Sequence, residues 1–151
     1  MTWNELFIRQ AMLIALKSKD PSTKVGCVIV SPDNVVLSMG FNGFPRGVNE
    51  LDMVRWGRPQ KYSWIEHAER NAVYNAARHG IRLYGARAYL NFEPYPCADC
   101  TRALIQAGII EIIGPNIPFS GKGVGTDYHL DFAQIMCNEA GVELRIVEWK
   151  E

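Results

Sequence analysis

Three side chains of metal-binding type stand in two short segments of this 151-residue sequence. His67 opens a His-Ala-Glu segment that ends at Glu69, and Cys97 and Cys100 enclose a Cys-x-x-Cys segment preceded by Pro96. One imidazole and two thiolates suit zinc, and three protein ligands leave one tetrahedral position open for water. Zinc lets such a water ionise near neutral pH, and a neighbouring carboxylate can serve as general acid and base. The sequence therefore predicts a catalytic zinc site.

The Cys-x-x-Cys segment alone is weak evidence, because redox motifs and structural zinc sites also use it. A structural site needs a fourth Cys or His, and Cys27, Cys137, His79 and His129 have no suggestive spacing. A redox motif needs no His-x-Glu partner. The combination of both segments is the signature of zinc nucleobase deaminases, and we take that class as the leading interpretation.

The spacing of these residues restricts how their helices must lie. Cys97 and Cys100 are three apart, so on a helix they face one side. His67 and Glu69 are two apart and diverge on a helix body, so they can serve one site only at a helix N-terminus. A Ser-x-x-Glu capping box at 63–66 predicts that N-terminus, and the proline before the first cysteine predicts a second. We expect two helix N-termini, whose dipoles favour thiolates, to converge on one metal.

The rest of the chain alternates helical and strand patterns. A capping box at Thr2–Glu5 opens the first helix, and a glycine at 141 closes the last. An α/β fold follows, with a five-stranded mixed sheet, helices on both faces and a parallel arrangement of the last three strands. Residues 41–62 form a long loop, which inside a compact domain is usually functional or mobile. Helices are expected at 2–17, 63–80, 96–108 and 128–140, and strands at 24–31, 35–40, 87–92, 109–114 and 142–149.

Composition limits the class of protein further. The formal net charge is zero, so no long-range attraction to a nucleic-acid polymer is expected. No apolar run approaches 18 residues and the N-terminus has no basic region, which argues against a membrane span or a secretory signal. Cys27 and Cys137 fall in apolar or helical patterns and are expected to be buried thiols. We predict one domain over 1–151 in a reducing compartment, the cytoplasm.

Four blocks of the sequence are similar to the deoxycytidylate deaminases of the cytidine deaminase superfamily. They are residues 20–30, residues 40–47, the zinc segments and residues 127–129, and the turn at 106–109 agrees with them. The Gly-Phe-Asn-Gly run at 40–43 is close to the usual Gly-Tyr-Asn-Gly of that family. The resemblance implies a three-layer cytidine deaminase-like fold and hydrolysis of dCMP to dUMP and ammonia. The compact length is typical of a phage or bacterial member.

The same resemblance implies regulation and particular ligand contacts. It implies activation by dCTP with Mg²⁺, inhibition by dTTP, and a homo-oligomer, often a hexamer. Asn42 is implied to contact the sugar or an effector, and Tyr128 to stack on the base. Gly40, Gly43 and Arg46 are implied to belong to the effector site. The alternatives are a turn asparagine with positive φ for Asn42 and an ordinary aromatic residue at a helix start for Tyr128.

A substrate with a 5′-phosphate requires a cation near the site. Spacing does not choose among the candidates, although Lys24 is favoured because it lies in one of the matching blocks. Some relatives hold a second, structural zinc in an inserted segment, but 41–62 contains no Cys or His, so one zinc per chain is predicted. The candidate cations are Lys24, Arg46, Arg58, Lys61, Lys122 and His129.

The sequence is also compatible with two other functions. The same chemistry could act on cytidine, cytosine or a tRNA adenosine. A zinc protein of this fold could also sense nucleotides without catalysis, although the intact Glu69 speaks against that.

Overall fold

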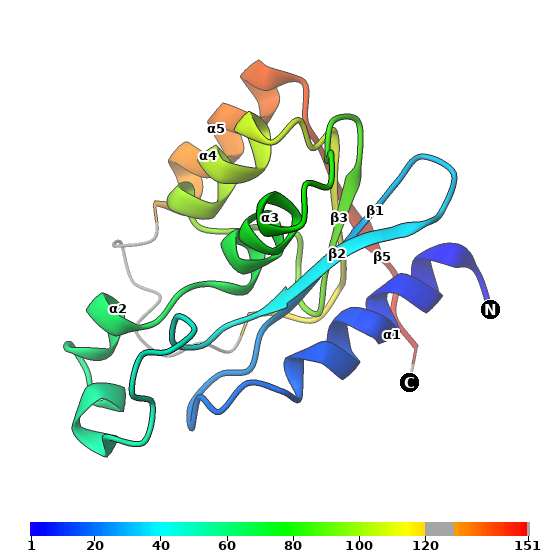
Figure 1. The fold of residues 1–151 in the computed structure, drawn as a ribbon. Coiled ribbons are helices and arrows are strands. Elements are labelled where there is room, and N and C mark those ends of the chain that lie inside the picture. The colour runs from blue at the N-terminus through cyan, green and yellow to red at the C-terminus, as the bar shows by residue number, and fades with distance from the viewer. Residues whose placement is uncertain (120–128, 151) are drawn as a thin grey trace.

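Five strands form one mixed sheet in the computed structural model, which describes residues 1–119 and 129–150 (Figure 1). The strand order is β2-β1-β3-β4-β5. β1 pairs antiparallel with both β2 and β3, whereas β3, β4 and β5 are parallel. The predicted parallel arrangement of the last three strands is confirmed. The strands are β1 (Gly26–Val30), β2 (Val36–Phe41), β3 (Arg87–Leu90), β4 (Glu111–Pro115) and β5 (Glu143–Val147).

Helices cover both faces of this sheet, which gives three layers (Figure 1). α1 (Trp3–Ala15) lies on one face, where Phe7 and Ile8 pack against Val28 and Tyr89. α3 (Ala68–Arg78), α4 (Ala98–Gln106) and α5 (Leu130–Ala140) lie on the other. Cys27 and Cys137 are buried in the core of this second face, as expected. Among the described helices, none has the length and apolarity needed to cross a membrane.

The capping box predicted for the first helix is present. The Thr2 hydroxyl accepts from Glu5 N at 3.2 Å, and the Glu5 carboxylate accepts from Thr2 N at 2.6 Å. The helix ends at Ala15, two residues earlier than predicted. At the other end of the chain, Gly141 closes α5 with φ of +73°, so the predicted C-terminal glycine is also confirmed.

The capping box predicted at 63–66 is wrong. Ser63 lies inside a separate short helix, α2 (Lys61–Trp64), and Ile65 has extended backbone. The reason is a long-range backbone pairing: Gly43 N donates to Glu66 O at 3.1 Å, and Glu66 N donates to Gly43 O at 2.8 Å. This bridge holds the chain extended until His67, which itself becomes the N-cap of α3.

The cysteine helix begins two residues later than predicted. Pro96 precedes the helix, Cys97 is the N-cap, and α4 begins at Ala98. The Cys97 sulfur accepts from Cys100 N at 3.5 Å, so a thiol takes the place of the usual hydroxyl or carboxylate cap. The long segment 41–62 contains a short 3-10 helix, η1 (Met53–Trp56), in addition to the start of α2.

Gly40 explains how α3 comes close to the sheet. A Cβ added at Gly40 would lie 2.5 Å from Ala68 O and 2.5 Å from Ala72 N. Any side chain there would push α3 away from β2, and the N-cap of α3 is His67, one of the predicted metal ligands. Gly40 therefore determines how close α3, and with it His67, lies to the sheet.

Candidate active site

The three predicted metal ligands meet at one point. His67 Nδ1 lies 3.4 Å from Cys97 Sγ and 3.3 Å from Cys100 Sγ. The three ligand atoms all lie within 4.8 Å of one another. Tetrahedral zinc, with Zn–S of about 2.3 Å and Zn–N of about 2.0 Å, separates its nitrogen and sulfur ligands by roughly 3.5 Å. The described side chains therefore fit a zinc ion almost without movement, and the imidazole ligand is Nδ1.

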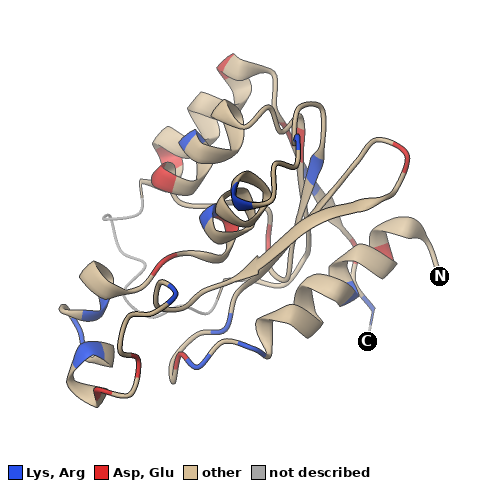
Figure 2. Cartoon of the chain, viewed as in Figure 1, with Lys and Arg blue, Asp and Glu red and all other residues tan. Residues whose placement is uncertain are grey.

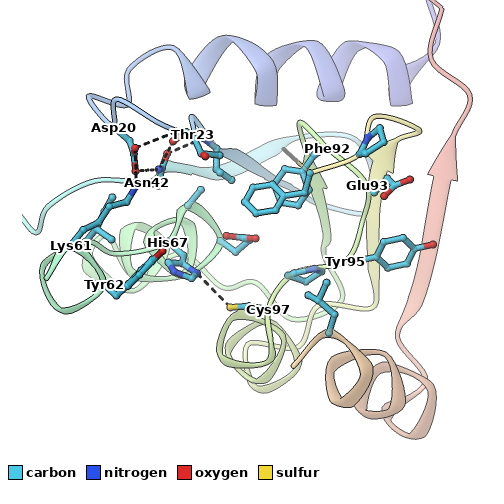
Figure 3. Close-up of a pocket in the computed structure, with 18 of the residues that line it drawn as sticks. Asp20, Thr23, Asn42, Lys61, Tyr62, His67, Phe92, Glu93, Tyr95 and Cys97 are labelled. Carbon is cyan, nitrogen blue, oxygen red and sulfur yellow. Dashed lines mark hydrogen bonds and ion pairs between the residues drawn. The ribbon is translucent and has the colours of Figure 1, made fainter. Parts of the chain in front are cut away.

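Two helix N-termini bring these ligands together, as the sequence predicts (Figure 3). His67 is the N-cap of α3, and Cys97 is the N-cap of α4 with Cys100 in the first turn. Both helix dipoles present their positive ends to the cluster. This arrangement favours a thiolate at the cluster even without a bound metal.

Arg70 links the two helix starts. Its guanidinium lies 2.6 Å from Glu66 Oε1 and 3.4 Å from Asp99 Oδ2, so it joins the residue before His67 to the first turn of α4. Glu66 Oε1 also accepts from His67 N at 2.9 Å. The position of the imidazole is thus fixed relative to the cysteine helix by charged hydrogen bonds.

The cluster perturbs the acidity of its own thiols. A hydrogen bond with Cys100 and another with the His67 ring lower the pKa of Cys97 to about 4. The same contact with Cys97, together with burial, raises the pKa of Cys100 well above its usual range. Only one thiolate is therefore favoured by the protein alone, and a divalent cation between the two sulfurs favours the ionised form of both.

Glu69 lies against the cluster. It is 4% exposed, and its Oε2 is 3.7 Å from Cys100 Sγ. Burial raises the pKa of this carboxyl group, and the His67 ring opposes that shift. A carboxyl group whose pKa is moved toward neutrality is suited to accept and return a proton during a reaction.

A cavity of about 260 Å³ opens above the cluster (Figure 3). It is close to the small end of the range for ligand sites, roughly 300–1,000 Å³. His67, Glu69 and Cys97 form part of its lining, and Phe92 is an apolar wall that packs on Phe119 at 4.7 Å between ring centroids. The cavity thus places an apolar surface and a buried carboxylate beside the three metal-ligand side chains.

Asn42 lines this cavity and is 6% exposed. Its Nδ2 donates to Thr23 O at 2.9 Å and to Asp20 Oδ2 at 3.3 Å, and its Oδ1 accepts from Val25 N at 2.8 Å. It is not among the described residues with positive φ, so the turn-asparagine alternative is wrong. Because both amide hydrogens are used, Asn42 can offer a ligand only the second lone pair of Oδ1.

Lys24 does not belong to the described lining of the cavity. Its Nζ donates to Ser18 O at 2.6 Å, and this contact directs the ammonium group to the loop backbone. Tyr128 and Lys122 lie outside the described residues. The structure therefore brings Asn42, but not Lys24, to the metal pocket.

The three other residues assigned to the effector site lie elsewhere. Gly40 is packed under α3, and Gly43 forms the bridge to Glu66 described above. Arg46 is exposed, and its Nη2 donates to Asn75 Oδ1 at 2.6 Å. None of the three is part of the described cavity lining.

Asp20 also belongs to the site, although its residue type and spacing in the sequence indicate no function. This residue is 2% exposed, lines the cavity and forms an ion pair of 2.8 Å with Lys61. Lys61 and Arg58, two of the six candidate cations, both line the cavity. The only sequence signal for Asp20 was its place at the start of the block 20–30 that resembles the deoxycytidylate deaminases.

The fold and the metal site define a zinc-binding deaminase of the cytidine deaminase type. The sequence profile of the "Cytidine and deoxycytidylate deaminase zinc-binding region" matches residues 1–114. That profile covers more than half of the chain, and the chain belongs to this family.

Curated relatives and solved structures agree. The chain is 33% identical over 151 residues to the deoxycytidylate deaminase of Homo sapiens, covering 96% of this chain and 79% of the relative. It is 38% identical over 113 residues to a probable deoxycytidylate deaminase of Caenorhabditis elegans, covering 72% of this chain but about half, 55%, of that protein. The dCMP deaminase of cyanophage S-TIM5, solved with dCMP and dUMP, has the same fold at a TM-score of 0.71 and 23% identity, covering 96% and 95% of the two chains.

Proposed function

We propose that this chain hydrolyses dCMP to dUMP and ammonia with the help of one zinc ion. The observation that carries the proposal is the buried Glu69 beside the cluster of His67, Cys97 and Cys100 at the base of the cavity. Membership of the family and the activity named for the human relative support the choice of substrate. A single domain over 1–151 and a cytoplasmic location are part of the same proposal.

Glu69 performs the proton transfers in this reaction. When bound, zinc supplies Lewis-acid activation of a water molecule. Glu69 accepts a proton from that water and delivers it to ring nitrogen N3 while oxygen adds to C4. The C4–N bond then breaks, and Glu69 carries the hydroxyl proton to the departing amine, which leaves as ammonia. Burial of the carboxylate keeps bulk water from competing for these protons.

The pocket walls hold the nucleotide for this step. We assign Asn42 Oδ1 as the acceptor from a sugar hydroxyl, and the support is that Asn42 lines the cavity while Thr23 and Asp20 already use its amide hydrogens. Phe92 offers an apolar face to the base. The stacking role assigned to Tyr128 stays a prediction.

The test replaces Glu69 with glutamine. Glu69→Gln should keep one zinc per chain by elemental analysis, and its kcat on dCMP should fall by about 10²–10⁴-fold, the usual contribution of general acid/base catalysis. Glu139→Gln is the matched control, since Glu139 is an exposed glutamate outside the described lining of the cavity. A zinc-loaded Glu69→Gln protein with undiminished activity would refute the mechanism.

Substrate class is tested by comparing dCMP, deoxycytidine and a tRNA hairpin. Lys and Arg are spread over several elements in Figure 2, so the described surface offers little attraction to a polymer. We expect turnover of dCMP well above that of the other two. Equal rates on dCMP and deoxycytidine would remove the claim to a monophosphate. Absence of turnover on all three, with zinc bound, would favour a nucleotide sensor.

We also propose that dCTP with Mg²⁺ activates the enzyme, that dTTP inhibits it, and that the chain assembles as a homo-oligomer, namely a hexamer. The support is the resemblance of residues 40–47, not the packing of Gly40 or Gly43. The expected result is a sigmoidal dependence of rate on dCMP that dCTP makes hyperbolic. Hyperbolic kinetics insensitive to both triphosphates would end the proposal.

A further inference from the structure

The cavity contains a buried ion pair that the reaction above does not use. The Asp20 and Lys61 side chains are 1% and 7% exposed, and Lys61 Nζ lies 2.9 Å from Oδ1 and 2.8 Å from Oδ2. Oδ1 also accepts from Ser22 N at 2.8 Å and from Thr23 N at 3.2 Å. A carboxylate held by this many donors fixes the ammonium group against one wall of the cavity.

Lys61 keeps one donor for a ligand. An ammonium group has three N–H donors, and the two oxygens of Asp20 engage two of them. Since its charge is matched by Asp20, Lys61 adds a positioned hydrogen bond and little net charge to the cavity.

Arg58 provides the net charge. Within 1–119 and 129–150, Arg58 and Lys61 are the lysine and arginine residues of the cavity lining, and Arg58 has no carboxylate partner there. Both belong to one turn of chain, because Lys61 N donates to Gly57 O at 2.8 Å. Arg58 is exposed, as a residue at the mouth of the cavity must be to meet an entering ion.

The charges of the cavity are separated in space. Asp20 and Lys61 lie together at one side, whereas Glu93 lies at the opposite side, and His67 and Cys97 lie between them (Figure 3). A dianionic group is repelled by Glu93 and attracted by Arg58. The cavity therefore favours a ligand whose anionic end points to the Asp20–Lys61 side.

We propose that Arg58 and Lys61 form the subsite for the 5′-phosphate, and that Arg58 determines the preference for a nucleoside monophosphate over a nucleoside. Arg58 supplies the charge, and Lys61, held by Asp20, supplies a fixed hydrogen bond. This inference rests on the proposed function for the identity of the nucleotide, and it favours Arg58 and Lys61 over Lys24 because only the first two line the described cavity.

The experiment measures binding, which needs no turnover. Calorimetry on the zinc-loaded protein compares dUMP with deoxyuridine. The Kd of deoxyuridine divided by the Kd of dUMP measures the preference for the phosphate. Arg58→Gln should lower that ratio by about 10- to 100-fold, the range for a lost charge-assisted hydrogen bond. Arg58→Lys should restore part of it. The matched control is Arg55→Gln, because Arg55 lies over Trp64 and is not in the described lining.

Each other outcome has a definite meaning. An unchanged ratio in Arg58→Gln, or an equal fall in Arg55→Gln, overturns the assignment. A change in oligomeric state with an unchanged ratio means that Arg58 meets another subunit, and this also overturns it. If the protein shows the phosphate preference but deaminates neither dCMP nor deoxycytidine, the proposed function fails while the subsite stands.

Discussion

A buried lysine and aspartate that both face a ligand cavity are tightly constrained residues. Removing only one partner leaves the other charge buried without compensation, which typically costs about 3–5 kcal/mol. Lys61→Met should therefore lower the free energy of unfolding by about that amount, because Asp20 is 1% exposed. Urea denaturation at neutral pH measures the change.

The control for this prediction removes both charges. The double variant Lys61→Met, Asp20→Asn should recover much of the lost stability, because no buried charge then remains unpaired. Equal stabilities for Lys61→Met and the unmodified protein would mean that Asp20 is solvated in solution.

The sequence predicted some of these residues and not others for a physical reason. The metal site could be predicted because its residue types and spacings rarely occur together outside this class of site. These residues are His67, Glu69, Cys97 and Cys100. Asp20 and Lys61 are 41 positions apart, and either residue type is usually solvated at a surface. Only the folded chain shows that they meet, and it also shows that Lys24 lies outside the described lining of the cavity.

At the scale of elements, the contact of α3 with β2 depends on one glycine. Gly40→Ala places a Cβ 2.5 Å from backbone atoms of Ala68 and Ala72, and backbone cannot yield as a side chain can. We expect a loss of stability of about 1–3 kcal/mol and weaker zinc binding, since α3 carries His67. Thermal unfolding with and without zinc measures both effects.

The next glycine in the same block is the matched control. A Cβ at Gly43 would meet only the Phe41 ring, at 3.7 and 3.9 Å, which is ordinary contact. Gly43→Ala should therefore be tolerated. Equal effects of the two substitutions would show that the close approach of α3 is not what Gly40 provides.

Arg70 joins the two helix N-termini, although it belongs to none of the sequence motifs. Replacing it in Arg70→Met removes its contacts with Glu66 and Asp99, so we expect zinc affinity to fall by about 10- to 100-fold, as for other groups that support metal ligands. Competition with a chromogenic chelator measures this. Arg102→Met, which removes the exposed partner of Asp99, should change the affinity much less.

The prediction of these elements failed mainly at their starts. A capping box was expected before His67, but the pairing of Gly43 with Glu66 holds that stretch extended. Local sequence signals cannot include a partner 23 positions away in the chain. The periodic interiors of the helices and strands, which depend on local pattern, were predicted within a few residues.

At the scale of the whole molecule, the sheet order explains why distant segments form one site. β1 runs antiparallel to β3, so the loop before β1, with Asp20, meets the end of β3, where the chain turns toward Cys97. The layer of α3 and α4 then closes the cavity from one face. The metal consequently joins segments from both halves of the sequence.

Zinc bound at this junction should stabilise the entire fold. A ligand that binds only the folded state stabilises by RT ln(1 + [L]/Kd), about 4 kcal/mol at a thousandfold excess over Kd. Treatment with a strong chelator should therefore lower Tm by several degrees, and zinc but not Mg²⁺ should restore it, since thiolates favour the softer ion. Cys97→Ser should start near the chelated Tm and respond little to zinc, because one sulfur ligand is gone. A Tm unaffected by chelator in a protein from which zinc has been shown to leave would mean that the helix dipoles and Arg70 hold the junction without the metal.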